Sequence, residues 1–137
     1  MTVFVDSNIP MYVAGREHPF KTPCTEFMRA VARRTIEAVS DVEVLQEILY
    51  RYHAIQQPDV GFAVFEAVVA TIPLIHPVSL EDLLASKAVL ARHPSVQPRD
   101  AIHAAVMQQI GIRTVVSYDR HFDQIETVAR VTPDQLL

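Results

Sequence analysis

Four acidic residues of this sequence occupy positions that would bring carboxylates together: Asp6, Glu47, Asp100 and Asp119. The first and the last follow short runs rich in β-branched residues, whereas Asp100 opens an alanine-rich stretch. The carboxyl ends of parallel strands meet at one edge of a sheet, so aspartates at strand ends converge there. Clustered carboxylates bind hard cations such as Mg²⁺ or Mn²⁺ through oxygen. The pattern therefore predicts an acidic site for a divalent metal.

Each of these acids also has a purely structural explanation. Asp6, in the triplet Asp-Ser-Asn, fits an Asx turn, Asp100 suits a helix N-terminus, and Asp119 suits the start of a short helical turn. Glu47 lies in a row with Glu43 and Arg51, at the spacing of a solvated, ion-paired helix face. The apolar residues around Glu47 instead favour a partly buried carboxylate, which needs a cation or a hydrogen-bond donor.

The residues around these acids favour some kinds of metal site over others. Four clustered carboxylates suit a two-metal hydrolase, in which one ion activates water and the other stabilises the leaving oxygen. The sequence has no His-Glu-x-x-His motif and a single cysteine, so zinc is disfavoured. His103, one helical turn after Asp100, is either a supporting group for the site or a packed or surface residue. Phosphate-loop motifs are absent, which gives nucleotide binding no support.

Composition is that of a packed globular chain. Among 137 residues, 50% are hydrophobic and 20% are charged, which argues against disorder. The formal net charge of −4 is unlike that of a passive nucleic-acid binder, which needs excess positive charge. Setting the four acids aside leaves 12 acidic residues against 12 basic ones. The lone cysteine, and the lack of a signal peptide or a membrane-length apolar stretch, predict a cytoplasmic protein without a membrane partner.

The elements that must position the acids alternate between strand and helix. Strands are predicted over 2–5, 36–39, 74–75, 114–117 and 128–131. Helices are predicted over 9–13, from the Thr22-Pro23 pair, from a Ser40–Glu43 capping box to Ala54, from Pro58, from Ser79 to Arg92, and from Pro98 to before Gly111. This alternation predicts an α/β fold with a mostly parallel sheet covered on both faces, as one domain over residues 1–137.

Four short motifs occur in the order expected of PIN domains. They are Phe4-Val5-Asp6-Ser7-Asn8, the helix Val44-Leu45-Gln46-Glu47-Ile48-Leu49, the stretch Arg99-Asp100-Ala101-Ile102-His103-Ala104-Ala105, and Val116-Ser117-Tyr118-Asp119-Arg120-His121-Phe122-Asp123. The chain most resembles the VapC-type toxins of toxin–antitoxin pairs, and the resemblance covers essentially its whole length. It implies a PIN-like three-layer α/β/α sandwich whose central, mostly parallel sheet has about five strands.

The resemblance also implies an activity and a set of site residues. A PIN domain of this type is expected to be a metal-dependent endoribonuclease, whose acidic site around Mg²⁺ or Mn²⁺ would be formed by Asp6, Glu47, Asp100 and Asp119. Asn8 and Ser117 resemble the polar residues beside that site, and Asp123 resembles an additional acid found in part of the family. The expected partners are an RNA substrate, a second copy in a homodimer, and a small antitoxin that occupies the active-site groove.

Other functions are compatible with parts of the same pattern. PIN domains also serve in RNA processing, and a degenerate PIN domain would act as a non-catalytic binding module. A phosphohydrolase with an aspartyl nucleophile usually has a second acid two residues later, where this chain has Asn8. A receiver-like signalling domain is disfavoured, because no acid precedes Asp6 and Arg120 rather than a lysine follows Asp119.

Overall fold

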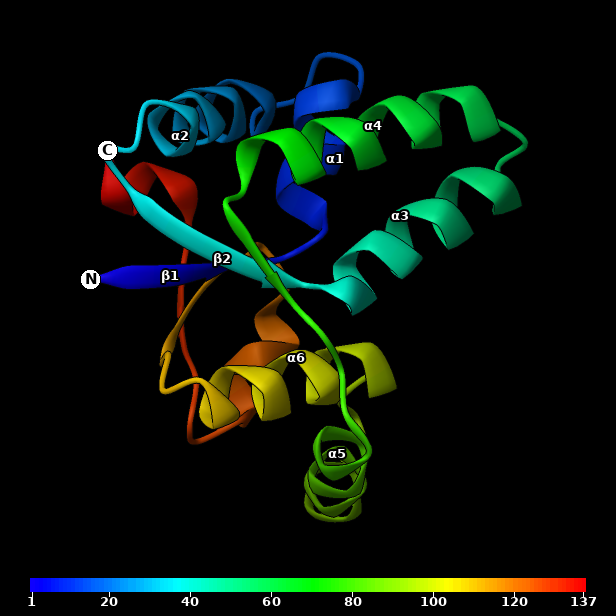
Figure 1. Cartoon of the computed structure of the whole chain (residues 1–137), viewed down its shortest axis with the longest axis vertical. Coiled ribbons are helices and arrows are strands. Elements are labelled where there is room, and N and C mark those ends of the chain that lie inside the picture. The colour runs from blue at the N-terminus through cyan, green and yellow to red at the C-terminus, as the bar shows by residue number, and fades with distance from the viewer.

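The computed structural model describes residues 1–137 and has a five-stranded sheet at its centre, in the order β3-β2-β1-β4-β5 (Figure 1). Its strands are β1 (Thr2–Val5), β2 (Glu37–Asp41), β3 (Leu74–His76), β4 (Thr114–Val116) and β5 (Ala129–Val131). Every neighbouring pair is parallel. The predicted α/β class and the five strands are confirmed, with small differences at the strand ends.

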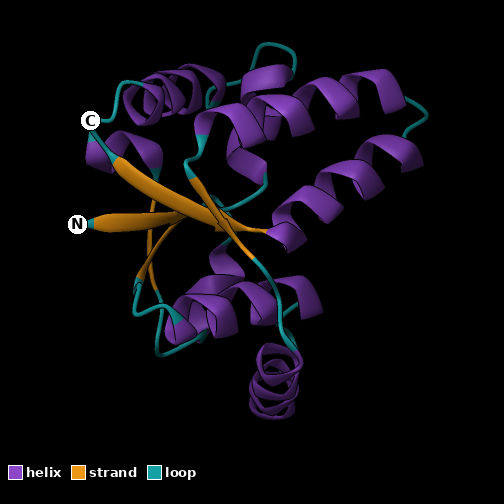
Figure 2. Cartoon of the chain, viewed as in Figure 1, coloured by secondary structure: helices purple, strands orange, loops and turns teal.

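Helices cover both faces of this sheet (Figures 1 and 2). One side carries α1 (Asn8–Ala14), α2 (Lys21–Ala32) and α4 (Pro58–Thr71), while α6 (Pro98–Gln109) covers the other and α5 (Leu80–Arg92) packs on α6. The helix α3 (Val42–Ala54) leaves the end of β2 and pairs with α4 in a helical hairpin. Two short 3₁₀ helices follow β4 and β5: η1 (Arg120–Gln124) is the short helical turn that Asp119 was expected to cap, whereas η2 (Pro133–Leu136) was not predicted.

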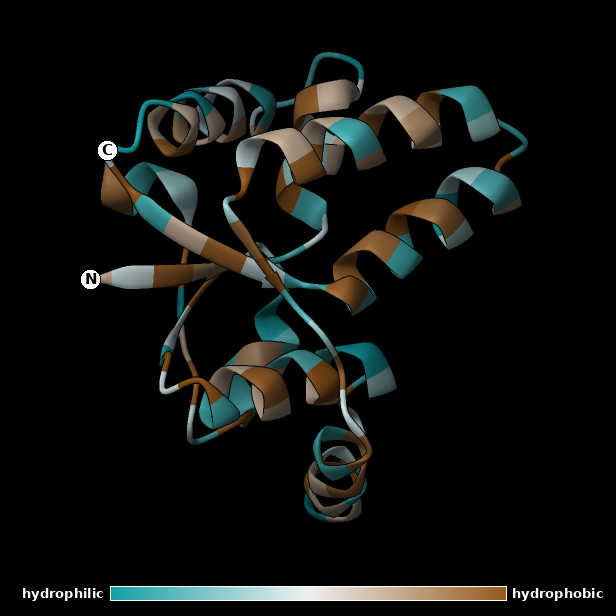
Figure 3. Ribbon diagram, in the orientation of Figure 1, coloured by the Kyte–Doolittle hydropathy of each residue, from teal (hydrophilic) through white to brown (hydrophobic).

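The central strand β1 explains where the core lies. Its residues Val3, Phe4 and Val5 are at most 1% exposed, as expected for a parallel strand covered on both faces. Hydropathy colouring shows apolar segments along the strands and on helix turns beside them (Figure 3). On the opposite side, α6 presents Ala101 and Ala104, both nearly fully buried, and their small side chains let this helix approach the sheet closely. No helix is long and apolar enough to span a membrane.

The start of α2 differs from the prediction. Thr22 was expected to cap the helix, but α2 already begins at Lys21, with Phe20 at the N-cap and no side-chain cap. The ring of Phe20 stacks on Tyr118 with centroids 3.7 Å apart and planes at 5°. Tertiary stacking therefore fixes this helix start in place of a local hydroxyl cap.

The predicted capping box of α3 is also wrong. Ser40 lies in β2, where its Oγ donates to the carbonyl of Val5 on β1 at 2.9 Å. The N-cap is Asp41, whose Oδ1 accepts the backbone N–H of Val44 at 3.0 Å. Because β2 ends two residues later than predicted, the helix begins at Val42, and this shift sets which of its residues face the sheet edge.

A single glycine sets the contact between α3 and α4. A Cβ atom added at Gly61 would lie 2.6 Å from the Cβ of Tyr52, far inside van der Waals contact. The hairpin therefore packs backbone against side chain at this point. This contact limits how closely α3 and α4 can approach each other.

The sheet register brings the ends of the first and fourth strands side by side. Val5 on β1 pairs with Val116 on β4, and the backbone N–H of Asp6 donates to the Val116 carbonyl at 3.2 Å. The strand order reverses at β1, since β2 lies on one side of it and β4 on the other. Such a switch point is where open parallel sheets form ligand sites.

Candidate functional site

Asp6 is the first residue after β1, and its carboxylate is held from several directions. Its Oδ1 accepts the backbone N–H of Ser7 at 2.8 Å, and its Oδ2 accepts Ser117 Oγ at 2.6 Å and Asn8 Nδ2 at 3.1 Å. The residue is 2% exposed. Burial, together with the nearby Glu47 charge, raises the pKa of Asp6 above its ordinary value despite these hydrogen bonds.

Asn8 and Ser117 form a small polar bridge beside Asp6. Asn8 Nδ2 also donates to Ser117 Oγ at 3.0 Å, and the backbone N–H of Asp119 donates to that same hydroxyl at 2.9 Å. Asn8 Oδ1 accepts the backbone N–H of Tyr118 at 3.4 Å. This network ties the end of β1 to the chain that leaves β4, so it orients both strand-end aspartates.

Asp100 lies in the first turn of α6 and differs from Asp6 in having no donor. It is 1% exposed, and no N–H or hydroxyl group donates to either of its carboxylate oxygens. Burial raises the pKa of Asp100 to about 9, and the adjacent carboxyls of Asp119 and Asp6 contribute further. Without a cation, this side chain keeps a proton at neutral pH, and the neighbouring Asp119 carboxylate is placed to share it.

Asp119 follows β4 and caps η1. Its Oδ1 accepts the backbone N–H of His121 at 2.9 Å, and His121 Nδ1 lies 2.9 Å from the same oxygen. Burial alone would raise the pKa of Asp119, but a proton shared with Asp100 and the hydrogen bonds from His121 outweigh it, so the pKa is lowered. Asp119 therefore stays ionised beside the protonated Asp100.

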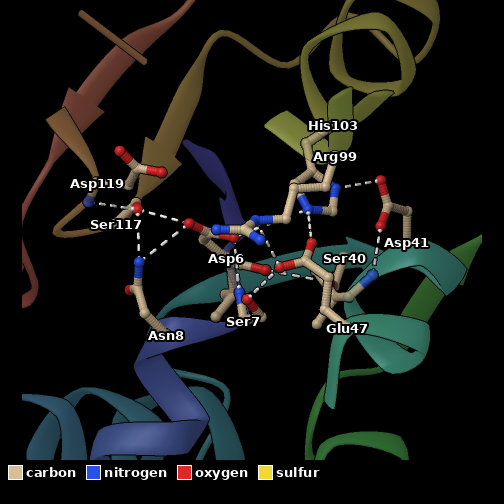
Figure 4. Close-up of polar contacts among 12 residues, drawn as sticks. Asp6, Ser7, Asn8, Ser40, Asp41, Glu47, Arg99, His103, Ser117 and Asp119 are labelled. Carbon is tan, nitrogen blue, oxygen red and sulfur yellow. Dashed lines mark hydrogen bonds and ion pairs between the residues drawn. The ribbon is translucent and has the colours of Figure 1, made fainter. Parts of the chain in front are cut away.

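Glu47 is a buried residue, and the surface ion-pair explanation of its spacing is wrong. It is 9% exposed on α3, and its Oε2 accepts Ser7 Oγ at 2.7 Å. His103 Nε2 lies 2.5 Å from its Oε1, and Arg99 Nε lies 3.4 Å from its Oε2. The predicted partner Arg51 makes no ion pair with it. Glu47 thus faces inward toward α1 and α6 (Figure 4).

Sequence reasoning missed Asp41 and undervalued His103. Both are 0% exposed, and His103 Nδ1 lies 2.8 Å from Asp41 Oδ2. Burial would lower the pKa of His103, but Asp41, Glu47 and Asp6 together raise it well above its ordinary value. The available signal was that His103 follows Asp100 by one helical turn. Asp41 gave no signal, because an aspartate at a helix start is usually explained by its cap.

Asp123 lies apart from the other acids. Its side chain is 53% exposed and forms a two-pronged ion pair with Arg130, with Nε to Oδ1 at 3.0 Å and Nη2 to Oδ2 at 3.2 Å. It does not line the cleft that contains Asp6, Asp100 and Asp119. The structure therefore gives Asp123 a role in fixing β5 against η1.

The acids open onto a cleft of about 520 Å³ at the carboxyl edge of the sheet. Its walls are mostly polar and comprise Asp6, Ser7, Asn8, Met11, Glu43, Gln46, Glu47, Tyr50, Arg51, Gln97, Pro98, Arg99, Asp100 and Asp119. Arg51 and Arg99 are the two cationic residues of this lining. The cleft thus combines a carboxylate floor with cationic groups at its side, a combination suited to a cation and a phosphate together.

The donor set fits a divalent metal. Ligand atoms of Asp6, Asp100 and His103 lie within 4.8 Å of one another, as do those of Asp100, Asp119 and His121. Asp100 belongs to both groups, and it is the residue whose oxygens have no other partner. A buried carboxylate without donors is costly, and a cation would remove that cost. Predominantly oxygen ligands favour Mg²⁺ or Mn²⁺.

Comparison with known proteins agrees with this geometry. A family model for the PIN domain matches residues 3–128. The chain therefore belongs to the PIN-domain family. Among its curated relatives are VapC proteins: ribonuclease VapC13 of Mycobacterium tuberculosis is 34% identical over 129 residues, which cover 94% of this chain and 98% of that protein. Ribonuclease VapC23 of the same species is 29% identical over 117 residues, or 85% of this chain and 92% of that protein.

Solved structures confirm the PIN-like sandwich. The M. tuberculosis toxin VapC20, described as cleaving the sarcin-ricin loop, aligns with a TM-score of 0.74 at 17% identity, over 90% of this chain and 95% of that one. The DNA-bound VapBC complex of Salmonella typhimurium aligns with a TM-score of 0.73 at 18% identity, over 97% and 98%. At these identities the likeness concerns the fold, and the resemblance to VapC-type PIN domains is confirmed by the sequence relatives.

Proposed function

We propose that this chain is a metal-dependent endoribonuclease that hydrolyses RNA phosphodiester bonds and acts as the toxin of a VapBC-type toxin–antitoxin pair. The observation that carries the proposal is Asp100, a buried carboxyl group without a donor beside Asp6 and Asp119. The relatives named as VapC ribonucleases support the reaction class. We also propose that residues 1–137 act as one PIN-like unit.

Each acid has a distinct part in this proposal. Asp6, Asp100 and Asp119 would hold Mg²⁺ or Mn²⁺, and Glu47 would either join them or orient the attacking water. When bound, the metal supplies Lewis-acid stabilisation of phosphate charge and a lowered pKa for water. Asp6 is suited to its part because Ser7, Asn8 and Ser117 already fix its carboxylate.

The cleft walls favour a polyanionic substrate in contact with cationic side chains. Arg99 has a side chain 49% exposed and lies at the edge of the acid cluster, where it can donate to phosphate oxygens as well as to Glu47. Arg51 lines the same cleft. The carboxylates of the cleft repel RNA until a metal neutralises them, so metal loading should precede productive RNA binding.

The proposed toxin role implies two protein partners, an antitoxin and a second copy of the chain. Structural neighbours include VapBC complexes, such as those of Salmonella typhimurium and Rickettsia felis, which supports an antitoxin that binds this chain. A homodimer is proposed as well, and the exposed leucines Leu80, Leu83 and Leu84 on α5 are compatible with a protein contact. The mass of the purified protein by light scattering, against 15.4 kDa for one chain, tests the dimer.

The first test is cleavage of single-stranded RNA. We expect cleavage with Mn²⁺ or Mg²⁺, none in EDTA, and a loss of about a hundredfold or more in Asp6→Asn, since bound metal contributes several kcal/mol to such reactions. Asp59→Asn, which alters an exposed acid in the first turn of α4, is the matched control and should cleave normally. Full RNA cleavage by the wild-type protein in EDTA would refute the proposal.

The alternatives give different results in separate measurements. A degenerate PIN domain that only binds partners should show no specific Mn²⁺ binding by calorimetry, whereas an active site should bind it through Asp6 and Asp100. A PIN nuclease of RNA processing would bind metal and cleave RNA but would have no antitoxin. A small basic or DNA-binding protein encoded beside this chain, able to inhibit its cleavage, would support the toxin role.

A further inference from the structure

A fully buried histidine lies between two carboxylates behind the cleft (Figure 4). His103 Nδ1 is 2.8 Å from Asp41 Oδ2, and its Nε2 is 2.5 Å from Glu47 Oε1. Asp41 is fixed in turn, because its Oδ1 accepts the N–H of Val44 at 3.0 Å. The second oxygen of Glu47 accepts Ser7 Oγ at 2.7 Å. Both oxygens of Glu47 are therefore held, and one chain of contacts runs from the α3 backbone through α6 and back to α3.

His103 is poorly placed to be a metal ligand, although it lies near Asp6 and Asp100. A ligating histidine must offer a nitrogen lone pair to the ion. Both ring nitrogens of His103 are already engaged, Nδ1 with Asp41 and Nε2 with Glu47. Neither nitrogen is therefore free to face an ion in the cleft.

We propose that Asp41 and His103 are positioning residues that aim the Glu47 carboxylate into the cleft. The inference rests on the proposed nuclease function, since it assigns Glu47 its orientation in that site. A glutamate side chain has three rotatable bonds and loses substantial rotamer freedom when it is held. Groups that hydrogen-bond a functional carboxylate fix its direction, and their loss typically lowers metal affinity or activity by about 10–100-fold.

A purely stabilising role explains the network less well. Asp41 and His103 are both 0% exposed, and burying charged groups costs free energy that their mutual attraction often fails to recover. Apolar side chains of similar volume would stabilise the contact between α3 and α6 as well or better. What apolar side chains cannot do is direct an oxygen of Glu47. The presence of buried polar side chains at Asp41 and His103 therefore supports a role in orienting the Glu47 carboxylate.

The test uses Asp41→Asn in the full chain. Asparagine is as good an N-cap as aspartate, so the Val44 hydrogen bond and the start of α3 can persist. One amide oxygen cannot serve both Val44 and His103 as the two carboxylate oxygens do, so the hold on His103 weakens. We expect the Mn²⁺ dissociation constant by calorimetry to rise, or kcat at saturating Mn²⁺ to fall, by about tenfold or more. The KM for RNA should change less than about twofold, because neither Asp41 nor His103 lines the cleft.

Asp82→Asn is the matched control. Asp82 is also a buried aspartate at a helix start, 5% exposed, and its Oδ2 accepts the backbone N–H of Ser79 at 2.9 Å. It lies on α5, outside the cleft lining. Its replacement should lower Tm while leaving Mn²⁺ affinity and kcat unchanged. A drop in Tm alone therefore indicates a purely stabilising role, whereas a change in Mn²⁺ affinity or kcat indicates that the residue positions Glu47.

A second variant keeps the test decisive. In His103→Gln the amide nitrogen can still donate to one carboxylate but the bridge between both is lost, so the same loss is expected. The proposal is overturned if folded Asp41→Asn and His103→Gln both keep wild-type Mn²⁺ affinity and kcat within about twofold. Failure of both variants to fold would assign the network to stability and overturn it as well. Wild type that neither binds Mn²⁺ nor cleaves RNA would instead refute the proposed function itself.

Discussion

At the scale of one residue, burial of Asp100 makes the stability of the metal-free protein depend on pH. The side chain is 1% exposed, has no donor, and has a pKa of about 9 against an ordinary value of 3.8. In the unfolded chain the same group is ionised at neutral pH. The folded, metal-free protein therefore holds a proton that the unfolded chain releases. The contribution of Asp100 to the free energy of unfolding therefore depends on pH. It is most favourable below pH 3.8, where both states are protonated, and it is lost progressively as the pH rises toward 9.

Replacing this residue should stabilise the metal-free protein. In Asp100→Asn the titration is removed, so we expect Tm in EDTA to exceed that of wild type by roughly 3 °C or more at pH 8. The difference should be smaller at pH 5, where the wild-type chain gains back part of its stability. Thermal unfolding followed by circular dichroism at both pH values measures it. A lower Tm for Asp100→Asn at pH 8 would contradict the account of Asp100 as a buried acid without a donor.

The residues of the site were predictable to different degrees. Asp6 and Asp119 follow strands, and a strand end is a local feature that the sequence pattern reveals. Glu47 had two explanations, and only the packing of α3 against α6 decides that it faces inward. The contacts of Asp41 with His103 join residues far apart in the chain, so no spacing rule applies to them. Local patterns find candidate ligands, whereas the groups that orient them depend on tertiary structure.

At the scale of the element, the hairpin of α3 and α4 depends on Gly61. In a helix, Gly→Ala usually stabilises by about 0.5–1 kcal/mol through backbone entropy. Here the added Cβ would meet the Tyr52 Cβ at 2.6 Å, so the helices must separate. We expect Gly61→Ala to lower the free energy of unfolding by about 1–3 kcal/mol, the range of overpacked cores, as measured by urea denaturation.

An exposed site on the same helix provides the comparison for that variant. Glu66 is exposed on α4 and has no ion pair, so Glu66→Ala should change stability by less than about 0.5 kcal/mol. Because α3 also carries Glu47, Gly61→Ala should reduce Mn²⁺ affinity in addition to stability. A Gly61→Ala protein more stable than wild type would show that helix propensity, and not the contact with Tyr52, dominates at this position.

Helix boundaries show which element features the sequence contains. Ser79 caps α5 in the predicted way, with its Oγ accepting the N–H of Asp82 at 3.1 Å, and Pro58 and Pro98 open α4 and α6 as predicted. Those starts depend only on neighbouring residues. Ser40 and Thr22 have the right chemistry for caps, but strand pairing and aromatic stacking override them. The errors thus fall where a long-range contact competes with a local one.

At the scale of the whole molecule, metal binding should appear as stabilisation. A ligand that binds only the folded state raises Tm with its concentration. Because the Asp100 proton must leave when a cation binds, the gain should depend on pH. We expect saturating Mn²⁺ to raise Tm more at pH 8 than at pH 6 in a fluorescence-based melt. Asp100→Asn should show little gain at either pH, and equal wild-type gains would argue against proton release.

The architecture as a whole was the most predictable level. Alternating strand and helix patterns, with apolar runs at 2–5 and 114–117, are enough to indicate a parallel α/β sheet. The strand order could not be read from the same patterns, because any of several arrangements buries the same residues. It is the pairing of β1 with both β2 and β4 that determines which loops meet at the cleft.

That strand order has a consequence for the protein during its synthesis. Asp6 is synthesised before the other three acids, yet its carboxylate is held by Ser117, and its strand pairs with β4 at residues Thr114–Val116. A nascent chain that stops before this point has Asp6, Glu47 and Asp100 but lacks Asp119 and the strand that positions the first aspartate. The acid cluster can therefore assemble only after the chain has been made as far as Asp119. Products that end before Asp119 should accordingly lack the complete acid cluster.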